Sequence, residues 1–214
     1  MSGCIISSVP LALLRSVAKP LAAALVVGLV AQPAHAHLVG VEFGDFYAGA
    51  LHVLSAPEHA AAMVGLALLA AFHPREASRW ILLGVPAGLI AGVALAAFTP
   101  FEIAMEPAIA LTLILAGLVG IAARPLPAAI LATFGGAVAV VHGFINAVSA
   151  REVSVDWLLY GGGIVATSSV LIILLIAAVA TLAEMADWVQ IAARAVSSWI
   201  TAIGVMYLAV SLIA

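Results

Sequence analysis

HVLSAPEH, His52–His59, places two imidazoles, a carboxylate, a serine and a proline inside an otherwise apolar run. Proline cannot donate a hydrogen bond within a helix, but it is favoured in the first turn of one. The apolar segment 44–72 is also too long for one simple membrane crossing. We therefore predict a short half-helix over 44–54, Ser55 in the N-cap region, and the membrane helix proper from Pro57 onward.

The composition around this stretch is that of an integral membrane protein. Hydrophobic residues make up 66% of the chain and charged residues 8%, with a mean hydropathy of +1.29. An average soluble domain is roughly 45–50% apolar and about 25% charged. The net charge of −3 comes from few residues in short loops, without a basic stripe, so we expect no nucleic-acid partner.

The first 36 residues read as a secretory signal peptide. A short apolar run, 21–30, follows two basic residues and precedes AQPAHA, 31–36, whose small residues suit cleavage after Ala36. An uncleaved first span is the alternative. Cleavage would make His37 the new N-terminus and would remove Cys4, the only cysteine, so any metal site would use nitrogen and oxygen donors.

The rest of the chain, 37–214, is predicted to be one all-α domain, a polytopic membrane helical bundle. Each candidate span is long enough to cross about 30 Å of hydrocarbon at about 1.5 Å per residue. Short, proline-rich connections predict sequential antiparallel neighbours. The six candidate spans are 44–72, 79–98, 103–122, 127–148, 157–182 and 190–213.

Arginines predict the orientation. Those near the loops after spans one, three and five outnumber those in the other loops, which hold only Arg151. The positive-inside rule then places the mature N-terminus and the C-terminus outside. The arginines expected on the cytoplasmic side are Arg75, Arg79, Arg124 and Arg194.

Glycines predict how closely the helices approach. Gly84, Gly88 and Gly92 recur at four-residue spacing, a small-residue ridge that lets membrane helices pack tightly. Three glycines in a row, 161–163, suggest instead a locally weak helix of the kind found near transport paths.

Ionisable side chains in a membrane are costly, and they normally face the bundle interior and serve a function. By depth, those of spans one, three and four should gather in the outer half of the bundle. Imidazole and carboxylate ligands at one level suit Ni²⁺, Co²⁺ or Zn²⁺. The predicted metal ligands within the membrane are His52, Glu58, His59, Glu106 and His142, with His37 at the outer mouth.

Each of these residues also has a purely structural interpretation. His142 can be a helix-to-helix hydrogen bond, and Glu106 can simply cap or solvate the outer interface. Ser55 and the hydroxyls of 167–169 can bond a carbonyl of the preceding turn. Asp45 can collect cations or be merely solvated, and the sequence leaves both readings open.

The run from His37 to Leu68 resembles the opening of the HupE/UreJ family of nickel permeases. The family's first span carries H-P-L-x-x-x-D-H, and His52 and His59 fall on its two histidines, with Glu58 in place of the aspartate. The segments MEPAIALT, 105–112, and HGFINA, 142–147, resemble the start of the family's third span and its H-G-x-A-H-G motif.

Three departures accompany this resemblance. Val53 stands where the family has proline, Asn146 replaces the second histidine of the H-G-x-A-H-G motif, and Leu171 stands where the family's span-five histidine is expected. The resemblance therefore implies a variant site with fewer nitrogen donors, and a weaker or different preference among divalent cations.

The resemblance implies a bacterial inner-membrane permease that takes Ni²⁺ or Co²⁺ from the periplasm to the cytoplasm. Its partners would be the metal ion, the lipid bilayer and, as an option left open, further copies of the chain, with no permanently bound cofactor. The alternative is a non-transporting metal-binding or scaffold protein for metalloenzyme maturation. An enzyme is not expected, because the chain has no H-E-x-x-H motif and no nucleophile paired with a base.

Overall fold

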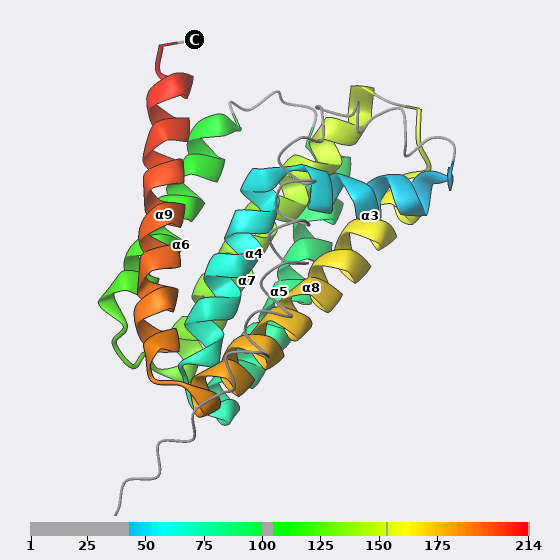
Figure 1. Cartoon of the computed structure of the whole chain (residues 1–214). Helices are drawn as coiled ribbons and strands as arrows, with labels where there is room; N and C mark the ends of the chain where they lie inside the picture. Colours follow the sequence, from blue (N-terminus) through cyan, green and yellow to red (C-terminus); the bar gives the residue numbers. More distant parts are fainter. Residues whose placement is uncertain (1–42, 100–104, 153, 214) are drawn as a thin grey trace, which may run out of the picture. The chain divides into compact units, whose positions relative to one another are not determined.

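The computed structural model describes residues 43–99, 105–152 and 154–213, and all regular structure within these ranges is helical (Figure 1). The chain divides into two units, 1–35 and 36–214, and every described residue belongs to the second. The predicted signal peptide, its cleavage after Ala36 and the proposed ligand His37 lie outside the described residues.

The all-α fold class is confirmed, and the helices begin and end close to the predicted bounds. The largest difference is at the start of the second predicted span, followed by the start of the third and the end of the fifth. The elements are α3 (Asp45–Ser55), α4 (Pro57–Ala71), α5 (Arg75–Phe98), α6 (Glu106–Ala122), α7 (Ala128–Ser149), the short 3₁₀ helix η1 (Ala150–Glu152), α8 (Trp157–Met185) and α9 (Trp188–Ser211).

Four of these helices, α5, α7, α8 and α9, are each long and apolar enough to cross a membrane. The pair α3 and α4 passes the same test together and is bent by 73° at the break, so it counts as one broken span or a re-entrant segment. Helix α6 has 17 residues and is shorter than the other spans. The described residues thus contain four or five spans by length, and the count of six stays a prediction.

The break predicted in the first span is present, one residue before Pro57. Ser55 ends α3, and its hydroxyl donates to the carbonyl of His52 at 3.2 Å. Ala56 is the N-cap of α4 and has no side-chain cap, so the placement of Ser55 in the N-cap region was wrong. Ala56 N–H also donates to His52 O, at 3.0 Å, which closes the last turn of α3.

The helices do not pair in chain order, and the prediction of sequential neighbours was wrong. The closest pairs are α5 with α7, α6 with α9, and α3 with α8, while α4 lies among them and contacts every other α-helix (Figure 1). Small residues select these partners. A Cβ on Gly88 would collide with the carbonyl of Gly136, and one on Gly117 with the side chain of Thr201. The predicted glycine ridge of α5 is therefore a packing surface, and it faces α7.

The glycine run 161–163 does not weaken its helix, because α8 is continuous from Trp157 to Met185. It forms instead the surface on which α3 lies. A Cβ on Gly163 would overlap the backbone oxygen of Phe46, and a Cβ on Gly49 would overlap that of Tyr160. The half-helix and α8 are thus in backbone-to-backbone contact, which requires glycine on both helices.

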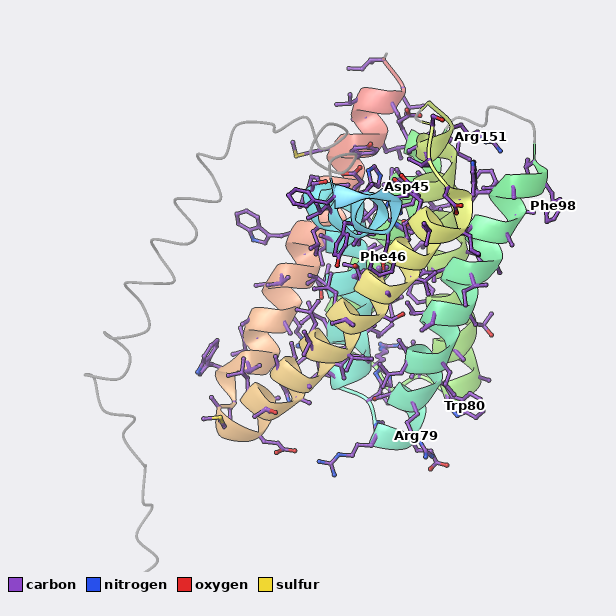
Figure 2. All side chains as sticks on the ribbon, turned by 90° about the vertical axis from the view of Figure 1, so that its right-hand side faces the viewer. Asp45, Phe46, Arg79, Trp80, Phe98 and Arg151 are labelled. Carbon is purple, nitrogen blue, oxygen red and sulfur yellow. The ribbon has the colours of Figure 1, made fainter. Side chains whose placement is uncertain are left out.

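Polar contacts hold the loops at the end of the bundle that contains α3, which we call the α3 end. Asp45 Oδ2 accepts a hydrogen bond from the backbone N–H of Asp156 at 2.8 Å, and Asp156 in turn caps α8. Arg151 donates to the carbonyls of Ala96 and Thr99 at the end of α5. Figure 2 shows Asp45 and Arg151 at this end, with Arg79 and Trp80 at the opposite end. Asp45 is therefore a structural hydrogen-bond acceptor.

The contact of α3 with α8 predicts opposite effects for two adjacent substitutions. Gly163→Ala should lower the free energy of unfolding by about 1–3 kcal/mol, because the new methyl group has no space. Gly162→Ala is the control, since its Cβ would meet only the Phe46 ring at 3.8 Å, and alanine should stabilise the helix by up to about 1 kcal/mol. Unfolding of the purified protein in detergent measures both. Equal effects would contradict this account.

Candidate functional site

Two histidines meet in the interior of the bundle near the α3 end. His59, in the first turn of α4, and His142, on α7, are both buried. Their Nδ1 atoms are 2.7 Å apart, a hydrogen bond between rings whose centroids are 4.9 Å apart. The sequence motif thus joins two helices far apart in the chain, and the hydrogen-bonding interpretation of His142 is observed.

The neighbours of this pair determine which nitrogen carries a proton. The buried Thr112 hydroxyl lies 2.7 Å from Ile109 O and 2.9 Å from His142 Nε2, and when it donates its single proton to Ile109 O it accepts from His142 Nε2. In that arrangement His142 Nε2 carries the ring proton. Since no carboxylate is hydrogen-bonded to either ring in the described chain, and an unpaired buried charge is costly, both rings are neutral. His142 Nδ1 then accepts from His59 Nδ1–H.

In this chain of hydrogen bonds His59 donates from Nδ1, so its other ring nitrogen, Nε2, is unprotonated and has a lone pair. The contact with His142 is made by Nδ1 and not by this nitrogen. A ring that donates from one nitrogen and presents the other is the arrangement found in metal-binding histidines, whose far N–H is almost always held by a second group. The contacts therefore place His59 Nδ1, His142 and Thr112 in one hydrogen-bonded chain and leave His59 Nε2 outside it.

His52 approaches the pair from the other side of the helix break. Its ring lies with its centroid 5.8 Å from that of His59 and 6.3 Å from that of the buried Tyr160 on α8. On a continuous helix these two histidines, seven residues apart, would stack along one face. The 73° bend instead brings them together from two helices that run in different directions.

Asn146, the residue that replaces the family's second motif histidine, is buried one turn beyond His142. Its Nδ2 donates to His142 O at 2.6 Å. Its Oδ1 is buried and has no hydrogen-bond partner among the described residues. An unsatisfied buried acceptor of this kind calls for a water or an ion.

The two predicted glutamates form a separate group. Glu58 and Glu106 both lie within electrostatic range of the Tyr207 phenol on α9, at the α3 end. Glu58 is half-buried and Glu106 is exposed. The structure therefore divides the predicted ligands into an imidazole cluster of His52, His59 and His142 and an outer carboxylate pair. In the described ranges no group of three or more His, Cys, Asp or Glu side chains is already placed to hold one metal ion.

Thr112, Tyr160 and Tyr207 belong to this site although sequence reasoning did not select them. Thr112 ends the segment MEPAIALT, and a hydroxyl at that depth was the available signal. The two tyrosines gave no signal of their own, because aromatic residues are ordinary in membrane helices. The prediction that hydroxyls bond a carbonyl of the preceding turn is confirmed at Ser169, whose Oγ donates to Val165 O at 2.6 Å.

These features define a multi-pass helical membrane protein with a buried pair of histidines, His59 and His142, next to a broken first span. Residues 24–207 match the family model described as HupE / UreJ protein. The chain therefore belongs to the HupE/UreJ family. Neither the curated proteins nor the solved structures include a match to it.

The hydrogen-bond chain predicts that Thr112 sets the tautomer of His142. Thr112→Val keeps the shape but removes the acceptor, so the His142 Nε2 proton loses its partner and the free energy of unfolding should fall by about 1 kcal/mol. Nitrogen NMR of ¹⁵N-histidine-labelled protein should show a changed protonation pattern for His142. Thr112→Ser keeps the hydroxyl and should retain the wild-type pattern. The same pattern in both variants would refute the assignment.

Proposed function

We propose that this protein is a bacterial inner-membrane permease that carries a divalent transition metal, Ni²⁺ or else Co²⁺, from the periplasm to the cytoplasm. The observation that supports it best is the buried pair His59 and His142, with His52 beside it, directly below the helix break. Neutral imidazole nitrogens bind these borderline cations well. Membership of the HupE/UreJ family supports the same function.

In this proposal the ligands have different roles. His59 binds through Nε2 and His52 binds from across the break, while the buried Oδ1 of Asn146, one turn along α7 from His142, offers an oxygen donor. His142 and Thr112 orient His59 without touching the metal. Conduction requires ligand exchange, so a partly assembled site suits transport better than a closed cage would.

Glu58 and Glu106 lie at the α3 end, around Tyr207, where they attract cations before these reach the imidazole cluster. His37 would serve the same purpose at the outer mouth. The proposal assigns no enzymatic reaction and no resident cofactor to the chain, because the metal ion is its cargo. The mature N-terminus and the C-terminus would both be periplasmic.

Metal flux tests the function. Purified protein in liposomes loaded with a fluorescent chelator should admit Ni²⁺ or Co²⁺ at neutral pH, while empty liposomes should not. His52→Ala and His59→Ala should each abolish most of the flux. Ser169→Ala is the matched control, since its hydroxyl bonds only within α8. Metal binding without flux in wild-type protein would overturn the permease and favour the scaffold alternative.

The division into ligands and orienting residues predicts a ranking of metal affinities. Loss of an outer-shell hydrogen bond typically weakens metal binding by about 10–100-fold. Thr112→Val should fall in this range, and His59→Ala should lose more than about 100-fold because it removes a donor atom. Isothermal titration with Ni²⁺ measures both. Unchanged affinity in His59→Ala would reject His59 as a ligand even if flux persists.

A further inference from the structure

The end of the bundle opposite to α3 contains a cavity whose lining includes none of the proposed metal ligands. It lies between α4, α6 and α9 and has a volume of about 190 Å³. Its polar lining includes Arg124, Arg194 and Gln190, and its apolar lining includes Leu69, Phe72 and Val119. A water occupies about 30 Å³ in the liquid, so the cavity has space for a group the size of a phosphate with a few attached atoms.

The charge in this cavity is uncompensated. Arg124 and Arg194 form no ion pair with any carboxylate of the described chain, and no described carboxylate lines the cavity. The ion pair that the described residues do contain, Arg75 with Glu184, lies outside it. Arg124 and Arg194 are both exposed and line one small cavity without a described carboxylate, so they favour an external anion, and arginine suits phosphate oxygens in particular.

The loop that carries Arg124 is held in place. Ala123, the C-cap of α6, has a positive φ of 46°, which turns the chain sharply into this loop. Two residues after Arg124, the backbone N–H of Leu126 donates to His73 Nε2 at 2.9 Å, and His73 Nδ1–H donates to Leu69 O at 2.7 Å. Both His73 nitrogens thus form hydrogen bonds that attach the loop to α4. The backbone that carries Arg124 is therefore held in place.

Two features indicate that the anion comes from the bilayer. Trp188, at the start of α9, is exposed, and so is Trp80 near the start of α5 at the same end of the bundle (Figure 2). Tryptophan in such positions marks the level of the lipid headgroups. The wall below the arginines is apolar and comes from three membrane helices, so it fits the beginning of an acyl chain better than a soluble ion.

We infer that this cavity binds the phosphate headgroup of an anionic phospholipid through Arg124 and Arg194. Basic cavities between membrane helices are known to hold such headgroups. The lipid would tie α6 to α9 and α4 at the end distant from the histidines. This binding is separate from the proposed metal transport and does not depend on it.

Lipid titration of the full chain in a neutral detergent tests this inference. Dioleoyl-phosphatidylglycerol should raise the melting temperature by several degrees, while dioleoyl-phosphatidylcholine should have little effect. The double variant Arg124→Gln with Arg194→Gln should bind phosphatidylglycerol about 30-fold more weakly. Arg79→Gln is the control, because Arg79 is exposed at the same end but does not line the cavity.

Equal stabilisation by the two lipids would overturn the inference, and so would equal binding of phosphatidylglycerol by the double variant and by Arg79→Gln. Full stabilisation by glycerol 3-phosphate would also overturn it, because it would indicate a site for a soluble anion. If the double variant is unstable, native mass spectrometry of the wild type decides. In that measurement the wild-type protein must retain phosphatidylglycerol in preference to phosphatidylcholine.

Discussion

A helix that breaks at membrane depth loses backbone hydrogen bonds, and lipid offers no replacement for them. The break before Pro57 imposes this constraint on the whole bundle. Backbone groups beside it are paired within the protein, since Ala56 N–H donates to His52 O and Ala56 O accepts from His59 and Ala60. The half-helix α3 is covered by α8, and α4 is surrounded by all the other α-helices. The glycines of α8 are therefore as necessary to the break as the proline itself.

The break also explains why the imidazole cluster can exist. A straight first span would point its two histidines along one face toward a single neighbouring helix. The bend instead lets α3 bring His52 from one direction and α4 bring His59 from another, while α7 and α6 supply His142 and Thr112. Four helices thus contribute one polar group each, and the desolvation cost of each group is offset by a partner.

Much of this fold follows from the sequence alone, because the relevant signals are local. Hydropathy located the helices, and proline located the break. Helix partners did not follow, since Gly84 to Gly92 show that α5 packs tightly but not that it packs on α7. The site was harder to predict than the fold. The position of a residue along a helix gives its depth in the membrane, but it does not give the neighbouring helix toward which its side chain points. Glu58 and His59 are consecutive, so their side chains leave α4 about 100° apart and reach different neighbours. Depth alone had placed them in one cluster.

Helix α6 has a consequence for the membrane itself. At about 1.5 Å per residue its 17 residues measure about 26 Å, which is less than the roughly 30 Å of an average hydrocarbon core. It begins at Glu106 and is followed closely by Arg124, so a charged residue lies at or near each end. A bilayer that α6 crosses must match this shorter hydrophobic thickness, and the mismatch is relieved by local thinning. The protein would then deform the membrane beside α6 and leave it undisturbed beside the longer helices α5, α8 and α9.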